Sequence, residues 1–256
     1  MSEFKQHESC PSCGSKDNLA RYTDGHAWCF GCGHYEPVPM AERIKTAFQP
    51  PPPSTVPGEC QALPSDIIKY IPAQCWTWLK KYDILESERK DNLFGWSENT
   101  KLLIMPVYSG SSWVDPLTKG RLLMWQGRYF GPNDNHPKYL TRGYPEQVIH
   151  IINDRASDTI VLTEDLISAI KVGRQFTSMP LWGSNLSLER IMRLSRLTKS
   201  LVIWLDADKF GEAQKYRSRA SQFIPNVHVI QTPKDPKEYS DDEIYMAVTN
   251  KILGGK

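Results

Sequence analysis

After residue 147, short apolar runs alternate with helix-like segments. Five of the runs have the length and apolar content of buried strands: 148–152, 160–163, 178–182, 201–205 and 227–230. Three segments between them are predicted helices: 166–174, 188–197 and 211–223. Because strands that alternate with helices form parallel sheets, we expect an α/β domain over residues 151–256. Ligands of such a domain bind at the carboxyl ends of its strands.

The preceding region, residues 65–150, has a less regular pattern. Residues 66–82 predict short helices that break near Pro72, because proline cannot continue a helix. Residues 102–108 predict a strand that Pro106 interrupts, and another strand pair is expected around 122–129. We therefore expect an α+β subdomain ahead of the parallel sheet.

A proline-rich stretch over residues 41–64 separates this subdomain from the beginning of the chain. It contains four consecutive prolines, Pro50 to Pro53, and almost no aliphatic periodicity. Such a composition favours extended polyproline conformation and forms no core, so we interpret it as a semi-rigid tether. A proline-rich ligand for a partner domain is the alternative.

Residues 1–40 contain two CxxC pairs. Cys10 and Cys13 are separated from Cys29 and Cys32 by fifteen residues, the spacing of a zinc ribbon in which each pair aims two thiolates at one ion. Four thiolates leave no open position, so the predicted Zn²⁺ is structural. The segment has few aliphatic residues, and the metal must supply much of its folding free energy.

Composition and charge indicate where the protein is located and what it binds. The 256 residues carry a net charge of +2, lack a run apolar enough to span a bilayer and begin with polar residues, so we expect a cytosolic protein. Residues 119–144 hold five basic residues against one acid, interleaved with aromatic ones. This pattern suits phosphates and bases. The alternative is that the basic residues form an ordinary solvent-exposed face and that the aromatic residues belong to the core.

Acidic residues follow three of the predicted strands. Asp206 and Asp208 come directly after 201–205, two residues apart, and would leave the same side of the backbone if the strand continued. Glu164 follows 160–163 and Asp235 lies in the loop after 227–230. Carboxylates that converge without matching cations predict a Mg²⁺ site, with unrelated loop acids as the alternative. Asp165 could join them or cap the next helix.

The segments TEDLISAIK, GSN, VIWLDADKFG and PKDPKEY, in this order, resemble the Toprim domain of bacterial-type primases, topoisomerases and some nucleases. With the ribbon, the tether and the basic segment, the chain resembles the primase half of the primase-helicases of short-tailed bacteriophages over nearly its full length. The resemblance implies a DNA primase with a zinc ribbon, an α+β subdomain and a Toprim domain. Such a primase would use a single-stranded DNA template and ribonucleoside triphosphates and would have no membrane partner. If a phage encodes the chain, it would act in the cytoplasm of the bacterial host.

The resemblance also implies roles for residues. Glu164, Asp206 and Asp208 match the catalytic, metal-binding acids, and Asp235 matches a later acid of the same Mg²⁺ site. Asp24 and His26, in the TDGH segment of the ribbon, match residues that bind the template in the family. Arg128 and Lys138 lie in the segment that matches the family's binding site for nucleotide phosphate.

Two features depart from the family pattern. Asp165 stands where the family has glycine and Ser168 where it has an acid, which leaves the number of Mg²⁺ ions open. No GxxxxGK[ST] loop is present, so we expect either a separate replicative helicase, with a DNA polymerase as a further partner, or a chain cut from a longer one.

Two other functions compete with primer synthesis. A Toprim nuclease would cut nucleic acid with Mg²⁺ and need no ribonucleotides. A non-catalytic ribbon protein would bind single strands and keep its function after Asp206→Ala.

Overall fold

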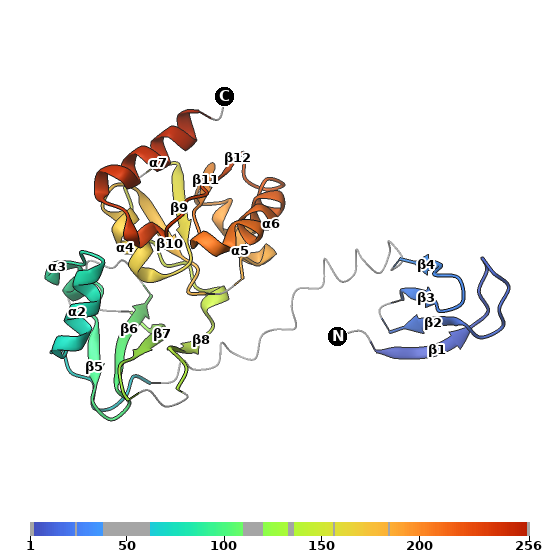
Figure 1. Ribbon diagram of the computed structural model, residues 1–256, viewed down its shortest axis with the longest axis horizontal. Coiled ribbons are helices and arrows are strands. Elements are labelled where there is room, and N and C mark those ends of the chain that lie inside the picture. Colours follow the sequence, from blue (N-terminus) through green and yellow to red (C-terminus); the bar gives the residue numbers. More distant parts are fainter. Residues whose placement is uncertain are drawn as a thin grey trace. The chain divides into compact units, whose positions relative to one another are not determined.

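The computed structural model describes residues 3–23, 25–37, 62–109, 120–132, 136–155, 157–183 and 185–254. The chain forms two compact units, Met1–Pro57 and Gly58–Lys256, which are coloured blue and cyan to red in Figure 1. Asp24 and nearly all of the predicted tether lie outside the described residues. Among the described residues, no helix is both long and apolar enough to cross a membrane.

The first unit contains a small antiparallel sheet. Its strands pair in chain order: β1 (Phe4–Glu8), β2 (Leu19–Tyr22), β3 (Ala27–Cys29) and β4 (Tyr35–Glu36). The buried apolar cluster of this sheet consists of Cys10, Leu19, Ala27 and Cys29, two of which are cysteines. Such a core is too small to hold the sheet together, so the ribbon needs another source of stability.

The second unit begins with an antiparallel sheet and two helices. The sheet has the order β5 (Gly95–Ser97), β6 (Leu102–Tyr108), β7 (Leu122–Tyr129) and β8 (Tyr139–Gly143). The helices α2 (Ala73–Lys81) and α3 (Glu86–Asp91) lie beside β5 (Figure 1). The expected break at Pro72 is the start of α2, and residues before it form a turn with one bridge to β5.

Pro106 does not interrupt β6, contrary to the sequence prediction. It pairs with Trp125 in a strand that runs unbroken to Tyr108. The pairing with β5 ends at Ile104, so one side of β6 has no paired strand at Pro106. The missing N–H of proline therefore breaks no ladder hydrogen bond on that side.

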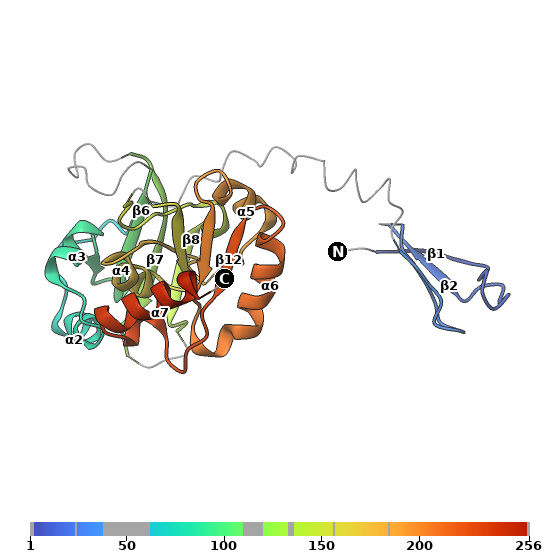
Figure 2. The same ribbon diagram turned by 90° about the horizontal axis from the view of Figure 1, so that it is seen from above.

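The second sheet is parallel throughout, which confirms the predicted α/β architecture. Its order is β10 (Thr177–Pro180), β9 (Thr159–Thr163), β11 (Ser200–Ile203) and β12 (Asn226–Val229). The apolar residues of α5 (Leu188–Leu194) and α6 (Phe210–Ala220) pack on one face of this sheet. Those of α4 (Leu166–Gly173) and α7 (Asp241–Leu253) pack on the other, as Figures 1 and 2 show.

The apolar run 148–152 is not a strand, although its pattern predicts one. Only Ile152 makes a bridge, to Ser178. Val148 and Ile152 pack into the cluster that contains α2 and α4, whereas Ile149 and Ile151 pack against the cluster that contains α5 and α6. The run is apolar on both sides because it connects two cores.

The antiparallel sheet and helix α4, which covers the parallel sheet, share one hydrophobic cluster. A single buried cluster joins residues of α2 and β6, such as Leu79 and Leu103, to Leu166 and Ile170 of α4. The loops after β9 are thereby fixed against the antiparallel sheet. The proposed boundary between residues 150 and 151 stays a prediction.

Candidate metal centres and active site

The four ribbon cysteines come together as one cluster. Their sulfur atoms all lie within 4.8 Å of one another, with 3.7 Å from Cys10 to Cys32 and 3.7 Å from Cys13 to Cys29. Thiolates around tetrahedral Zn²⁺, with bonds of about 2.3 Å, are about 3.8 Å apart. The cluster therefore fits one structural zinc, as its spacing predicts.

Two matching turns hold these cysteines. The N–H of Gly14 donates to the carbonyl of Cys10, and the N–H of Gly33 donates to that of Cys29, both at 2.9 Å. Both glycines have positive φ, 69° and 73°, a conformation that side chains with a Cβ rarely adopt. Each CxxC pair is thus closed by a glycine that follows its second cysteine.

His26 lies in an aromatic group on the ribbon. Its ring stacks on Tyr22 with centroids 4.2 Å apart, and Tyr35 lies 6.1 Å away. Trp28 and Tyr35 are both exposed. Exposed aromatic faces on a sheet can stack with unpaired bases. Asp24, the other residue expected to contact template, lies outside the described residues.

The predicted acids lie at the carboxyl ends of three adjacent parallel strands. Glu164 follows β9, Asp206 follows β11 and Asp235 precedes the short turn η4 (Pro236–Glu238) after β12. Asp208 lies in the turn η3 (Ala207–Lys209) and is exposed. We call these four residues and Asp165 the acidic edge.

The condition under which Asp206 and Asp208 would share one side of a strand is not met, because the backbone turns at Asp206 and the extended strand does not continue to Asp208. The N–H of Lys209 donates to the carbonyl of Asp206 at 2.9 Å, which closes η3. The N–H of Ala207 donates to Oδ1 of Asp235 at 3.2 Å. These two bonds fix the loop after β11 against the loop after β12.

Lys237 lies among three carboxylates of the acidic edge. Its Nζ is 2.7 Å from Asp165 Oδ2, 3.0 Å from Asp235 Oδ2 and 3.3 Å from Asp206 Oδ2. Asp165 also caps α4, where its Oδ1 accepts the N–H of Ser168 at 2.9 Å. Asp165 thus caps the helix, which is one of the two roles that the sequence leaves open, and its place in a metal site stays a prediction.

Two carboxylate oxygens of the acidic edge are buried without a hydrogen-bond partner. They are Oε2 of Glu164 and Oδ1 of Asp206. Burial raises the pKa of Glu164, and burial with the neighbouring charge of Asp165 raises the pKa of Asp206 to about 7. Despite its burial, Asp235 has a lowered pKa because Lys237 and the N–H of Ala207 donate to it.

These orphaned oxygens fit a hard cation, which binds carboxylates that lack other donors. However, the four cysteines are the only group of three or more candidate ligands within 4.8 Å among the described residues. The acids of the edge therefore do not form a compact cage by themselves. A site that uses a few carboxylates together with waters and substrate phosphates is typical of Mg²⁺.

Arg128 lies in an aromatic cage. Its guanidinium carbon is 4.4 Å from the ring centre of Trp78 and 5.3 Å from those of Phe130 and Tyr139, and its Nη1 donates to the Tyr139 hydroxyl at 2.8 Å. Burial raises the pKa of Tyr139, and the charges of Asp165 and Lys237 also act on it. Trp78 also contacts Tyr82, with ring centres 6.0 Å apart, and the Tyr82 ring centre lies 5.9 Å from Lys237 Nζ, so two aromatic rings connect Arg128 to the acidic edge. Lys138 is exposed.

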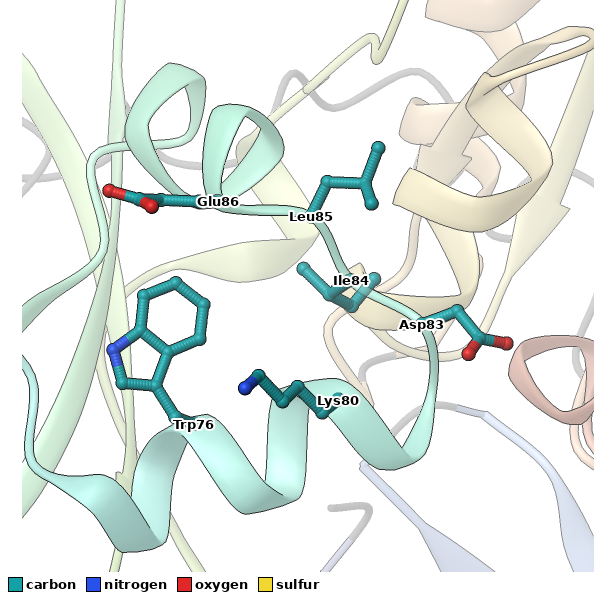
Figure 3. A pocket seen from close by; sticks show the side chains of 6 residues that line it. All are labelled: Trp76, Lys80, Asp83, Ile84, Leu85 and Glu86. Carbon is teal, nitrogen blue, oxygen red and sulfur yellow. The ribbon is translucent and has the colours of Figure 1, made fainter.

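A cavity of about 560 Å³ lies between α2 and the start of α3. Figure 3 shows its lining: Trp76 and Lys80 come from α2, Glu86 from the start of α3, and Asp83 to Leu85 from the connection between the two helices. Its described lining residues include none of the acids or cations discussed above. We therefore treat it as separate from the acidic edge.

Comparison with known proteins gives relatives of one kind, although no family profile matches the chain. A DNA helicase/primase of Enterobacteria phage T3 is 50% identical over 35 residues, which cover 14% of this chain and 6% of that protein. A DNA primase of Staphylococcus epidermidis is 27% identical over 195 residues, which cover 64% of this chain and 30% of that protein. The chain thus spans less than a third of either relative.

A solved structure of the Aquifex aeolicus primase, comprising its zinc-binding and RNA polymerase domains, has the same fold. It superposes with a TM-score of 0.56 at 14% identity, covering 97% of this chain and 80% of that one. In sequence the chain resembles phage and bacterial DNA primases, as its motifs predict, and it has the zinc-binding and RNA polymerase fold of a bacterial primase.

Proposed function

We propose that this chain is a DNA primase, which makes short RNA primers on single-stranded DNA from ribonucleoside triphosphates. The observation that carries the proposal is the pair of buried carboxylate oxygens without partners, on Glu164 and Asp206, at the carboxyl edge of a parallel sheet. A triphosphate and its divalent cation are the ligands that such an edge suits. The resemblance to primases supports the same assignment.

In the proposed reaction, the 3′-hydroxyl of one nucleotide attacks the α-phosphorus of the next, and pyrophosphate leaves. No protein nucleophile takes part. Glu164, Asp206, Asp208 and Asp235 would hold Mg²⁺, which when bound supplies positive charge against the triphosphate and the departing pyrophosphate. Lys138 and Arg128 would bind nucleotide phosphates close to this edge.

The ribbon would bind the template. Its exposed aromatic residues, Trp28 and Tyr35, offer faces on which unpaired bases stack, and His26 with Asp24 would contact base edges. A replicative helicase and a DNA polymerase are the partners that a primase serves, and both belong to the proposal.

The proposal is tested with random-sequence single-stranded DNA, labelled ribonucleotides and Mg²⁺. We expect short RNA products from the wild-type chain and a loss of at least about 100-fold in Asp206→Asn, with DNA binding retained. Asp158→Asn is the matched control, because Asp158 is an exposed acid at the opposite end of β9. Its activity should equal that of the wild type.

Two results would count against primer synthesis. Intact DNA binding without RNA products on any template contradicts it. Cleavage of DNA in the absence of ribonucleotides, lost in Asp206→Asn, would instead identify the nuclease alternative.

A further inference from the structure

Lys237 has the surroundings of a bound cation. Three carboxylates that follow three different strands surround its ammonium group, at 2.7, 3.0 and 3.3 Å. The side chain is only 14% exposed. An ammonium group has three N–H donors, and here each finds a carboxylate oxygen. The group therefore satisfies the same oxygens that a divalent cation would otherwise bind.

Several contacts fix the ammonium in this position. Lys237 lies in the turn η4, which begins with Pro236, and its Nζ lies 5.9 Å from the ring centre of Tyr82. Two of its three partners are fixed as well, because Asp165 caps α4 and Asp235 accepts the N–H of Ala207. Lys237 thus differs from an exposed surface lysine, whose ion pairs contribute little.

The charge of the lysine matters because its partners are half-buried. Carboxylates held this close repel one another unless a cation lies between them. A divalent ion placed among Asp165, Asp206 and Asp235 would have to displace the ammonium, since both need the same oxygens. Glu164 and Asp208 make no ion pair with Lys237 among the contacts of the described residues, and Asp206 keeps one oxygen, Oδ1, without a partner, so these three acids stay available to Mg²⁺. Of the four acids proposed to hold Mg²⁺, only Asp235 has both oxygens already bonded to other described residues.

We infer that Lys237 is a built-in cation of the acidic edge, which occupies the space among Asp165, Asp206 and Asp235 and keeps one divalent ion out of it. With Lys237 in this space, the acidic edge would bind one divalent ion fewer than it would if these three carboxylates were free. This inference rests on the proposed function, because it concerns the Mg²⁺ site of that function. It makes Lys237 a positioning residue, which acts through the carboxylates around it.

The test counts Mn²⁺ ions bound to the zinc-loaded full chain, from the loss of the free-ion signal in electron paramagnetic resonance. We expect Lys237→Gln to bind one more Mn²⁺ per chain than the wild type, because three carboxylates lose their shared ammonium. Lys234→Gln is the matched control, because it removes an exposed lysine from the same loop. It should bind as many Mn²⁺ ions as the wild type.

Equal counts for the wild type and a folded Lys237→Gln would overturn the inference. If that variant does not fold, as circular dichroism would show, the double variant Asp165→Asn with Lys237→Gln replaces it, since it removes both partners of the 2.7 Å pair. It too should gain one Mn²⁺, and a folded double variant without the gain overturns the inference. Failure of the proposed function is separate: the wild type would make no primers, whatever its Mn²⁺ count.

Discussion

Single side chains determine how the acidic edge differs from a plain cluster of carboxylates. Asp206 has one oxygen on Lys237 and another that is buried without a partner, so one residue combines a satisfied and an unsatisfied acceptor. The sequence identifies Asp206 because it directly follows an apolar run. Lys237 has no comparable signal, since two of its three carboxylate partners, Asp206 and Asp165, lie 31 and 72 residues away along the chain.

His150 provides a prediction about pH. Its ring stacks on Trp182 with centroids 5.7 Å apart, its Nδ1 is buried without a partner, and burial lowers its pKa to about 4. The folded chain then binds fewer protons than the unfolded chain between pH 4 and the ordinary histidine value of 6.5. The stability that neutral His150 permits is therefore full above pH 6.5 and is lost as the pH falls towards 4.

We expect His150→Phe to remove this loss. Phenylalanine keeps the flat ring but takes up no proton. On acidification, the free energy of unfolding of the variant should therefore fall less than that of the wild type, and the difference between the two falls should be up to about 3 kcal/mol. Denaturant unfolding of both chains at pH 7.5 and pH 4.5 measures the difference. An equal fall in both chains would show that His150 stays accessible to protons.

At the scale of elements, the alternating pattern after residue 147 predicts five strands and three helices, and four of those strands form the parallel sheet. It predicts them well because each buried strand is a short apolar run that polar turns bound. Periodicity misplaces 148–152, since a connector between two cores is as apolar as a strand. Periodicity also misses α7. The start of this helix is marked by Ser240 and Glu243, because the Ser240 hydroxyl oxygen accepts the N–H of Glu243, the third residue of the helix.

Arg174 joins three of the helices and supports a second prediction at this scale. Its guanidinium bonds Glu88 of α3 at 2.7 and 2.9 Å and Asp241 of α7 at 3.0 Å, and it follows α4 directly. These acids, with burial opposing them, raise the pKa of Arg174. Its planar group makes parallel bonds that lysine cannot reproduce.

Arg174→Ala should therefore lower the free energy of unfolding by about 1–3 kcal/mol, and Arg174→Lys should recover only part of the loss. Thermal unfolding of the three chains measures both effects. Arg196→Ala is a suitable control, because it removes an exposed arginine that lies just after α5 and makes no ion pair among the described residues. Full recovery by lysine would mean that charge alone matters at this position.

At the scale of the whole molecule, the two units depend on different sources of stability. Gly58–Lys256 has large buried clusters on both faces of its parallel sheet. The ribbon has a cluster of four residues, and its four thiolates repel one another unless a cation lies between them. The sequence predicts this contrast from cysteine spacing and aliphatic content alone. It does not predict a structure for residues 41–64, because this proline-rich stretch has almost no aliphatic periodicity.

Removal of zinc should therefore unfold the ribbon and leave the second unit folded. Cys13→Ser removes one ligand, so we expect zinc content to fall from one ion per chain towards none, as elemental analysis measures. Cys75→Ala is the matched control, because Cys75 is a buried residue of α2, in a cluster with α4, and does not belong to the group of four cysteines in the ribbon. Nuclear magnetic resonance should show loss of dispersed signals from residues 3–37 only.

The same variant separates template reading from nucleotide joining. If the ribbon presents the template, Cys13→Ser should lose template-dependent initiation and keep the extension of a short RNA already paired to DNA, since the acidic edge belongs to the other unit. Loss of both activities would mean that the ribbon also supports chemistry at the edge. Initiation at wild-type rate without zinc would contradict the role of the ribbon, because a buried cluster of four residues is too small to keep the ribbon folded without the ion.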